Sequence, residues 1–275
     1  MAESSPLPLL GRHNSLVQRL RRIVQRQERD LTVADGLKLA LDLAAAGVPI
    51  VELFAVPERL EALRSTPALS RVCDAGRAYL LDPATAAQLG PTRQPQGVFA
   101  VVPVPAAHIR PEGIVIYMDR VQDPGNVGGV IRCAAAFGAA GVMCSPGCAD
   151  PFSPRALRAS AGQALIMPVE AEASFAPPAE AVRRAGGEVA GTIGNGGVPL
   201  GRWRPRIPLL LALGNEGQGL SDEVAGGCRR QVTIPLGGGV ESLNVAVSAG
   251  VILASLAGVA ASPILESQGQ MGRPR

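Results

Sequence analysis

Short apolar runs alternate with helix-like segments from Gly113 onward, and this alternation constrains the fold more than any other feature. The runs are IVIYMD, GVMCS, MPVE, EVAGT, LLLALG and QVTIP, and helical patterns separate most of them. Strands that alternate with helices predict a mainly parallel sheet in an α/β fold. Ligands of such sheets bind at the carboxyl ends of the strands. We therefore expect the functional residues on the loops that follow these runs.

The residues before this series predict a second, smaller α/β unit, and a proline-rich segment separates the two. The segment PVPAAHIRPEG has the composition of a linker. We expect a flexible N-terminal tail over residues 1–11, a smaller α/β domain over 12–103, a linker over 104–112, the larger α/β domain over 113–261 and a flexible tail over 262–275. With 47% hydrophobic and 18% charged residues, the chain can bury a sizeable core.

Basic charge is concentrated near the N-terminus, where residues 12–29 carry six arginines and one glutamate. Leucine, isoleucine and valine recur there near helical spacing, and Asn14 or Ser15 is placed to cap a helix. The pattern predicts a basic amphipathic helix over this stretch. A solvated helix face is the simpler interpretation. The low acid content favours binding of RNA or another polyanion, with Arg19 and Arg22 as phosphate-contacting residues.

Cysteine usage and hydropathy exclude several classes of protein. The five cysteines form no CxxC pair and the chain has two histidines, so we expect reduced thiols in a cytoplasmic protein and no metal site. No charged segment followed by an apolar core marks a signal peptide. The uncharged stretch from Val245 to Ala261 is shorter than the roughly 20 residues of a membrane span. Its small residues at a spacing of four predict a tightly packed core or interface helix.

Three glycine-rich loops are expected at the carboxyl edge of the larger sheet. The first, DPGNVGGVIR, lacks the lysine of a Walker A loop and the GxGxxG spacing of a dinucleotide fingerprint. We interpret Gly125, Gly128 and Gly129 as permitting a tight turn that presents Asn126 and Arg132. The second loop carries Glu216, and the third carries Ser242 and Asn244. Helix capping is an alternative role for the last two residues, but all five are expected to converge at one edge.

The stretches DPGNVGGVIRCAAAFGAAGV, LALGNEGQGLSDEV and VTIPLGGGVESLNVAVSAGVIL resemble the three ordered motifs of the SPOUT superfamily, SpoU (TrmH-like) branch. The resemblance covers roughly residues 113–261. It implies an RNA ribose 2′-O-methyltransferase that uses S-adenosyl-L-methionine without a metal, a sheet threaded into a deep trefoil knot, and a homodimer. The N-terminal unit resembles the ribosomal-protein-like substrate-binding domain found ahead of such domains, with Asp35-Gly36 where the family usually has Glu-Gly.

The motif positions imply roles for individual residues. The donor contacts carry over to Gly214, Ile234 and Leu243, where the glycine would let adenosine approach the backbone. The catalytic set carries over to Asn126, Arg132, Glu216, Ser242 and Asn244. The family assigns the central role to the motif 1 arginine, here Arg132. Because a guanidinium stays protonated, our hypothesis is that it holds the adjacent phosphate and stabilises the developing alkoxide, while a phosphate oxygen or a transiently perturbed Arg132 accepts the proton.

The RNA target is the least constrained part of this interpretation. The segment SPRALRASAG resembles the family's helix after motif 1, and its Arg155 and Arg158 are expected either to contact RNA backbone or to lie on a solvated face. The additional N-terminal domain favours large-subunit ribosomal RNA. A transfer-RNA 2′-O-methyltransferase and a non-catalytic RNA-binding or ribosome-assembly protein remain as alternatives. A Rossmann-type oxidoreductase is disfavoured by the missing fingerprint.

Overall fold

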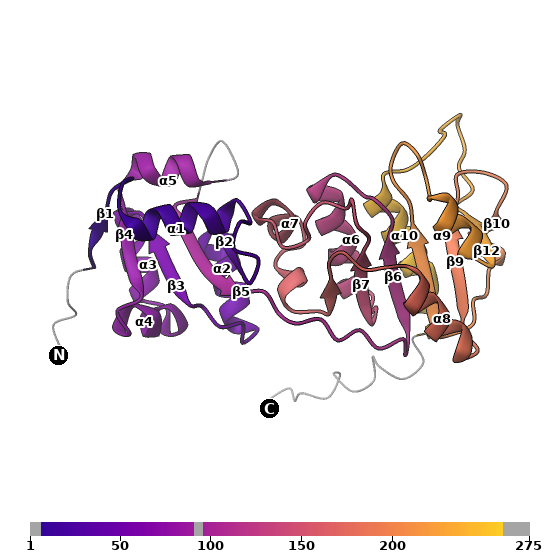
Figure 1. The fold of residues 1–275 in the computed structure, drawn as a ribbon, viewed down its shortest axis with the longest axis horizontal. Helices are drawn as coiled ribbons and strands as arrows, with labels where there is room; N and C mark the ends of the chain where they lie inside the picture. Colours follow the sequence, from indigo (N-terminus) through magenta and orange to yellow (C-terminus); the bar gives the residue numbers. More distant parts are fainter. Residues whose placement is uncertain (1–6, 91–95, 261–275) are drawn as a thin grey trace, which may run out of the picture.

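Two open sheets, one in each half of the chain, form the framework of the computed structural model, which describes residues 7–90 and 96–260 (Figure 1). The N-terminal sheet has the order β1-β4-β3-β5-β2. Its strands are β1 (Leu9–Leu10), β2 (Leu31–Asp35), β3 (Glu52–Ala55), β4 (Ala78–Leu81) and β5 (Val98–Pro103). Strand β5 runs antiparallel to β2 and β3, whereas β4 runs parallel to β1 and β3. The smaller unit is therefore a mixed sheet.

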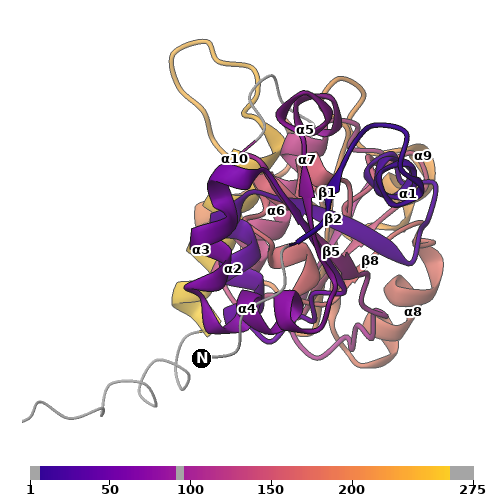
Figure 2. The ribbon, with the colours of Figure 1, turned by 90° about the vertical axis from the view of Figure 1, so that its left-hand side faces the viewer.

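Helices cover both faces of the N-terminal sheet (Figure 2). They are α1 (Ser15–Val24), α2 (Leu37–Ala45), the short helix η1 (Pro57–Arg59), α3 (Leu60–Arg64), α4 (Pro67–Asp74) and α5 (Pro83–Leu89). Helix α1 is shorter than the predicted span of residues 12–29. It begins after Asn14, whose side chain accepts the Leu16 N–H at 2.9 Å, and it buries Val17, Leu20 and Ile23 against the sheet. The N-cap and one apolar face thus define this helix.

The C-terminal sheet is parallel throughout, which confirms the predicted α/β fold class. Its order is β10-β12-β9-β11-β6-β7-β8, and every pairing of neighbouring strands is parallel. The strands are β6 (Ile114–Met118), β7 (Gly141–Cys144), β8 (Val169–Glu170), β9 (Glu188–Thr192), β10 (Val198–Pro199), β11 (Leu209–Leu213) and β12 (Arg230–Thr233). All five residues of the central strand β11 are buried, as expected for a sheet covered on both faces.

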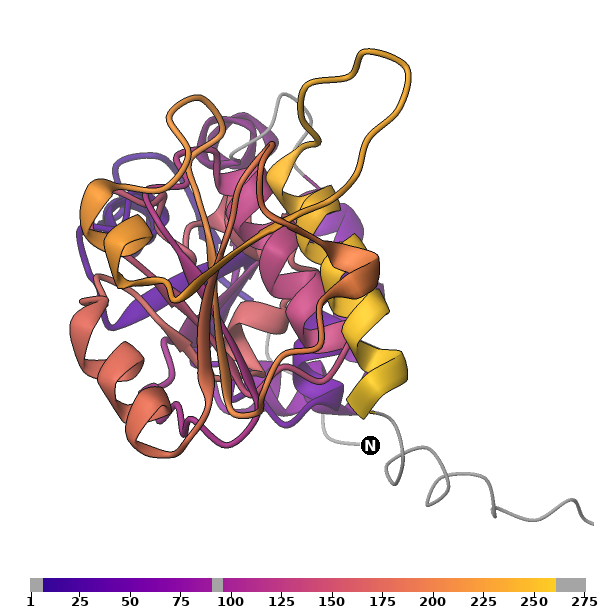
Figure 3. The ribbon, with the colours of Figure 1, turned by 90° about the vertical axis from the view of Figure 1, so that its right-hand side faces the viewer.

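Two helical layers enclose this sheet (Figure 3). Helices α6 (Pro124–Ala136), α7 (Pro154–Ala159) and α10 (Val245–Ala260) lie on one side, and α8 (Ala176–Arg184) and α9 (Asp222–Gly227) on the other. Two further short helices are η2 (Gln163–Leu165) and η3 (Leu200–Arg202). Helix α10 packs along α6, and the Sγ of Cys133 lies 3.3 Å from where a Cβ on Gly250 would stand. None of the helices in the described ranges is long and apolar enough to cross a membrane.

The two halves share one apolar core and a polar interface. A single cluster of buried residues extends from α2 and α4 into α6, α7 and α10. Helix α7 lies against β2, and residues 104–112 between the sheets contain no helix or strand. Polar contacts cross the boundary as well, among them Arg158 Nη2 to Asp35 Oδ2 at 2.6 Å, Thr32 Oγ1 to the Phe152 carbonyl at 2.5 Å, and Arg26 Nε to Asp150 Oδ2 at 2.8 Å. Side-chain packing therefore fixes the two units against each other.

The chain ends depart from the predicted tails in one place. Leu9 and Leu10, which we expected within a flexible tail over residues 1–11, form β1 and pair with Leu80 and Leu81. Leu10 is buried. A strand of two residues is too short to produce a recognisable alternation in the sequence. Residues 1–6 and the predicted tail over 262–275 lie outside the described residues.

Candidate active site

A cavity of about 350 Å³ lies at the carboxyl ends of β9, β11 and β12. Its walls come from residues 192–194 after β9, the loop 214–220 after β11, the segment after β12 and the first turns of α10. The three residues predicted to contact a methyl donor, Gly214, Ile234 and Leu243, all line it. The predicted catalytic residues Glu216 and Ser242 line it as well. The structure therefore brings two glycine-rich loops, which α9 and β12 separate in the chain, to one cavity.

Gly214 has a role in the fold of its own loop, besides the donor contact that the motif implies. A Cβ placed on this residue would lie 2.4 Å from the carbonyl carbon of Gly219 and 2.6 Å from the amide nitrogen of Leu220. Those atoms belong to the same loop, which folds back on itself through an Asn215–Gly219 bridge. The glycine thus allows the loop to close, because no side chain fits between its two arms.

Three of the predicted catalytic side chains form a hydrogen-bonded chain beside the cavity. Asn126 donates from Nδ2 to Glu216 Oε1 at 2.6 Å, and Asn244 donates from Nδ2 to Asn126 Oδ1 at 2.7 Å. Each residue comes from a different glycine-rich loop, so the expected convergence is found for this set. Asn244 also accepts the N–H groups of Ala246 and Val247 through Oδ1. Ser242 forms no hydrogen bond within the described part of the chain, so Asn244 is the residue that caps α10.

Arg132 lies away from this chain of side chains. It sits on α6 six residues beyond Asn126, which corresponds to about 9 Å of helical rise and a rotation of about 240°. Its side chain is exposed and has no hydrogen-bond or ion-pair partner among the residues that the structure describes. The expectation that Arg132 and Asn126 face the same point is therefore not met within a single chain, since they leave the helix in different directions.

The glycines of the first loop lie in α6 and do not form the tight turn that we predicted, and two of them pack against other helices. None of them has a positive φ, and all three lie inside the helix. A Cβ on Gly128 would meet the Ala156 carbonyl oxygen at 2.4 Å and the Ala159 Cβ at 2.6 Å, both on α7. A Cβ on Gly129 would meet the Ala246 Cβ on α10 at 2.7 Å. These glycines let three helices approach closely behind the cavity.

Replacing Gly128 by alanine is expected to lower the free energy of unfolding by about 1–3 kcal/mol, because the new methyl group collides with the backbone of α7. Gly226 is a matched control. It also lies in a helix, and a Cβ there would meet nothing within 4 Å. Gly226→Ala should be neutral or stabilising by up to about 1 kcal/mol, through helix propensity alone. Urea denaturation measures both changes, and equal effects would contradict the packing role.

The arginines predicted to bind RNA have acidic partners in the structure. Arg19 pairs with Glu52 at 2.7 Å and Glu28 at 3.4 Å, and Arg22 pairs with Glu28 at 3.2 Å. Glu52 lies on β3, so it was not visible as a partner in the local sequence. On α7, Arg155 lies 3.6 Å from Asp123, and its side chain is 63% exposed. Arg158 points into the interface between the two halves, where it pairs with Asp35 at 2.6 Å.

Burial raises the pKa of each of the five thiols above its ordinary value. For Cys228 desolvation raises the pKa to about 11. The thiolate is the reactive form of cysteine, so these side chains act as small apolar groups near neutral pH. Within the described ranges, no group of three His, Cys, Asp or Glu side chains is placed to hold a metal ion.

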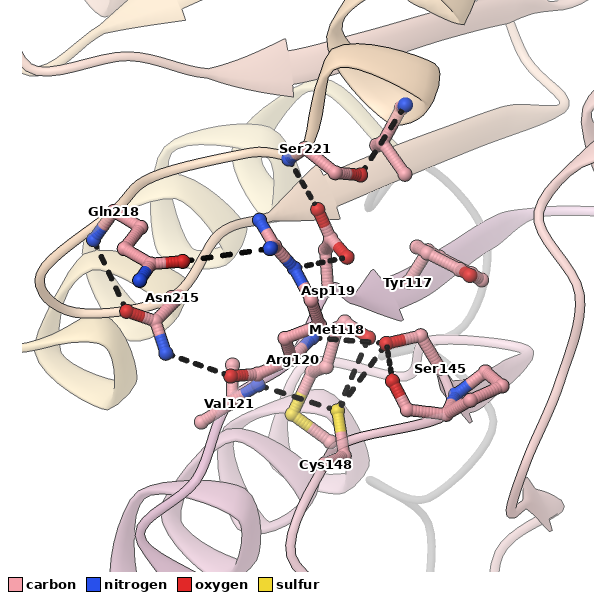
Figure 4. Close-up of polar contacts among 12 residues, drawn as sticks. Tyr117, Met118, Asp119, Arg120, Val121, Ser145, Cys148, Asn215, Gln218 and Ser221 are labelled. Atoms are coloured by element: carbon pink, nitrogen blue, oxygen red, sulfur yellow. Dashed lines mark hydrogen bonds and ion pairs between the residues drawn. The ribbon is translucent and has the colours of Figure 1, made fainter.

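A polar network at the end of β6 was missed from the sequence (Figure 4). Asp119 is almost fully buried and accepts the Ser221 N–H through Oδ2 at 2.6 Å. The carbonyl of Arg120 accepts the Nδ2 of Asn215 at 2.8 Å. The sequence did carry one signal for Asp119. A carboxylate directly after a strand of a parallel sheet stands at the edge where ligands bind. Its partners lie about a hundred positions further along the chain and carry no local signal.

Comparison with known proteins supports the motif assignment. The profile of the SpoU rRNA Methylase family matches residues 113–254, which include all three glycine-rich loops. This chain belongs to the SpoU rRNA methylase family. The sequence resemblance to the SpoU branch is thereby confirmed. As a SpoU protein, it is an RNA methyltransferase by family, and the cavity described above lies within the matched region.

Relatives in sequence extend the likeness beyond the SpoU region. An uncharacterized tRNA/rRNA methyltransferase of Mycobacterium avium is 32% identical over 247 residues, which cover 86% of this chain and 80% of that protein. One from Synechocystis is 36% identical over 181 residues, or 64% of this chain and 65% of its own length.

Solved SpoU structures share the architecture of both halves. The SpoU methyltransferase AviRb from Streptomyces viridochromogenes, in complex with the cofactor AdoMet, matches with a TM-score of 0.77 and 27% identity, over 91% of this chain and 99% of AviRb. An rRNA methyltransferase from Sinorhizobium meliloti matches with a TM-score of 0.75 and 27% identity, over 91% and 97% of the two chains. These matches include the N-terminal sheet, so the pairing of the two units is a shared feature.

Proposed function

We propose that this SpoU protein transfers a methyl group from S-adenosyl-L-methionine to a ribose 2′-hydroxyl of RNA, with large-subunit ribosomal RNA as the target. The observation that carries the proposal is the meeting of two motif loops at one cavity, with Asn126 of the third motif hydrogen-bonded to both of them. Gly214, Ile234 and Leu243 line this cavity, and the chain of hydrogen bonds from Asn244 through Asn126 to Glu216 runs beside it. The relative AviRb binds AdoMet, which supports the same donor here.

The cavity fits such a donor in size and in lining. Its volume of about 350 Å³ lies within the range of about 300–1,000 Å³ that ligand sites occupy. Leu220, Ile234 and Leu243 supply apolar surface, and the loop starting at Gly214 supplies main-chain polar groups. When bound, S-adenosyl-L-methionine supplies a methyl group already activated on a sulfonium. The chain then has to bind the donor, orient the ribose and stabilise the charge that develops on its oxygen.

The residues of this chain divide those tasks. Asn126 is held by Glu216 on one side and Asn244 on the other, so its amide is fixed next to the cavity wall that carries Glu216. Ser242 lines the cavity and lacks a hydrogen bond in the described chain, so its hydroxyl is available to the ribose. The exposed guanidinium of Arg132 holds the adjacent phosphate and stabilises the developing alkoxide. A phosphate oxygen of the RNA takes the proton.

We propose a homodimer that completes the site. Helix α10 exposes the apolar residues Val247 and Val251, which are 51% and 40% exposed, and neighbouring α6 ends next to Phe137, which is 39% exposed. Arg132 is exposed on α6 and is not engaged by the cluster around Asn126. A second copy packed on α6 and α10 covers the apolar side chains and places Arg132 at the interface. The trefoil knot, and a division into two domains on either side of residues 104–112, belong to the same proposal.

The N-terminal half and α7 form the RNA-binding surface in this proposal, through Arg19, Arg22 and Arg155, with Arg158 at their junction. The ion pairs of Arg19, Arg22 and Arg155 leave donors to spare, since each guanidinium offers five N–H groups. RNA binding should weaken steeply as salt concentration rises, because phosphate contacts release counterions. A cytoplasmic location follows from an RNA target. The N-terminal unit favours ribosomal over transfer RNA, and the connected catalytic side chains favour an enzyme over a non-catalytic binding protein.

Mapping 2′-O-methyl positions in total RNA, with and without the gene, tests the proposal. Loss of one position in large-subunit ribosomal RNA is the expected result. Loss of a transfer-RNA position would assign the enzyme to the alternative substrate. An unchanged map, together with no uptake of S-adenosyl-L-methionine in calorimetry, would favour a non-catalytic RNA-binding protein of the same fold.

A further inference from the structure

The loop from Gly214 to Ser221 forms one wall of the cavity, and it has little support of its own. Residues 216–219 are exposed. Within the loop, Asn215 Oδ1 accepts the N–H groups of Gly217 at 2.9 Å and Gln218 at 3.0 Å. These bonds shape the turn but do not attach it to the sheet. The position of the wall therefore depends on contacts from outside the loop.

Asp119 and Arg120 supply those contacts from the end of β6 (Figure 4). The carboxylate of Asp119, with 4% of its side chain exposed, accepts the Ser221 N–H at 2.6 Å and pairs with Arg120 Nε at 3.3 Å. The carbonyl of Arg120 accepts a hydrogen bond from Asn215 Nδ2 at 2.8 Å. The Nη1 of Arg120 donates to Gln218 Oε1 at 3.4 Å. The loop is thus attached at its start, at its tip and at its end.

The backbone of Arg120 adopts an unfavourable conformation in this arrangement. Its φ is +56°, in the left-handed region that residues with a Cβ rarely occupy. Its N–H donates to Ser145 Oγ at 2.9 Å, which fixes the peptide from the other side. Such conformations persist where the surroundings determine them strongly, and they concentrate near functional sites. The turn directs the Arg120 carbonyl to the side chain of Asn215.

We propose that Asp119, Arg120 and Asn215 are positioning residues, here called the β6 clamp, that hold the cavity wall in its donor-binding form before the donor arrives. The β6 clamp acts through the loop, whose Glu216 in turn holds Asn126. A wall ordered in advance avoids the entropic cost of ordering it on binding, so the donor binds more tightly. This inference rests on the proposed use of S-adenosyl-L-methionine at the cavity.

Asn215→Asp is the sharpest test, because it preserves the size of the side chain and the Oδ1 acceptor that shapes the turn. It replaces the Nδ2 donor with an oxygen that faces the Arg120 carbonyl. We expect S-adenosyl-L-methionine to bind about tenfold more weakly in calorimetry. The midpoint of thermal unfolding should stay within about 3 °C of the parent, since the fold keeps its core.

Arg120→Gly separates the contribution of the Arg120 side chain from that of its backbone carbonyl. Glycine adopts the positive φ without strain and keeps the carbonyl that Asn215 needs, while the contacts to Asp119 and Gln218 are lost. We expect a loss of donor affinity of about threefold, smaller than for Asn215→Asp. This variant also keeps the test decisive if Asn215→Asp does not fold.

Asn14→Asp serves as a charge-matched control, because aspartate caps α1 as well as asparagine does and lies in the other half of the chain. It should leave donor affinity unchanged. Hydrogen exchange without the donor supplies a readout independent of the proposed function, and the amides of residues 215–221 should exchange faster in Asn215→Asp. If exchange is faster in Asn215→Asp but the parent protein binds no donor, the proposed function is rejected and the clamp is retained. Unchanged exchange and unchanged affinity would overturn the clamp.

Discussion

Replacing Arg132 by alanine is expected to lower the rate of methyl transfer by about 10²–10³-fold, the usual cost of removing a group that stabilises a developing oxyanion. The structure gives this arginine no intramolecular task, since it is exposed and makes no hydrogen bond or ion pair within the described part of the chain. Binding of S-adenosyl-L-methionine should be unaffected, because Arg132 does not line the cavity. Single-turnover kinetics with the methylated RNA as product would measure the loss.

Two further variants define the role of Arg132. Arg132→Lys keeps the charge but loses the planar pair of donors that matches a phosphate, so its rate should fall between those of the parent and the alanine variant. Arg184→Ala removes an exposed arginine from α8, on the other side of the sheet, and should leave the rate unchanged. Near-normal turnover of Arg132→Ala would exclude the central role proposed for this residue.

Replacing Arg158 by alanine is expected to destabilise the protein by about 3 kcal/mol near pH 7, because the partner carboxylate of Asp35 stays buried without its counter-charge. Only 1% of the Asp35 side chain is exposed. Burial raises the pKa of Asp35, and the Arg158 guanidinium partly opposes this effect. Without Arg158 that pKa should rise further. Urea denaturation of the full chain measures the change.

The loss in Arg158→Ala should depend on pH in a defined direction. A carboxyl whose pKa is higher in the folded than in the unfolded chain binds protons more tightly when folded, so acid favours folding. The destabilisation should be largest above the pKa that Asp35 has in the folded variant. It should shrink as pH falls through that pKa. Adding Asp35→Asn should recover much of the loss at neutral pH. A destabilisation independent of pH would show that the ion pair is not its cause.

Arg155→Ala is the matched control for this experiment. Arg155 is on the same helix, but its side chain is 63% exposed and lies 3.6 Å from a half-exposed Asp123. Such surface pairs contribute little, so the free energy of unfolding should change by less than about 1 kcal/mol. RNA affinity is the property that this variant should change, through the loss of one phosphate contact.

The sequence predicted the sheet and the meeting of the three motif side chains because both depend on local patterns. Apolar runs located the long strands, and parallel strands place their carboxyl ends at one edge, which is why Asn126, Glu216 and Asn244 could be expected to meet. The position of Arg132 was not predictable to the same degree, since an offset of six residues sets a direction only once the helix boundaries are known. Helix α6 starts at Pro124, two residues before Asn126, so Asn126 and Arg132 lie on the same helix.

Contacts between distant segments could not be read from the sequence. Glu52 neutralises Arg19 across the N-terminal sheet, and Asp35 neutralises Arg158 across the interface between the two halves. The excess of arginine in the local sequence was therefore larger than the excess of charge in the folded protein. The glycines of α6 show the same limitation, because their neighbours on α7 and α10 appear only after folding.

The shared core of the two halves holds the N-terminal unit at a fixed distance from the C-terminal cavity. Because Thr32, Asp35 and the apolar side chains of α2 contact the C-terminal half directly, the segment 104–112 does not set the spacing between them. Under the proposed function, the protein itself therefore sets the distance from the arginines that contact the RNA to the nucleotide that is modified. An RNA target has to present its recognition element and its acceptor ribose at that separation, and a longer linker should not change which nucleotide is chosen.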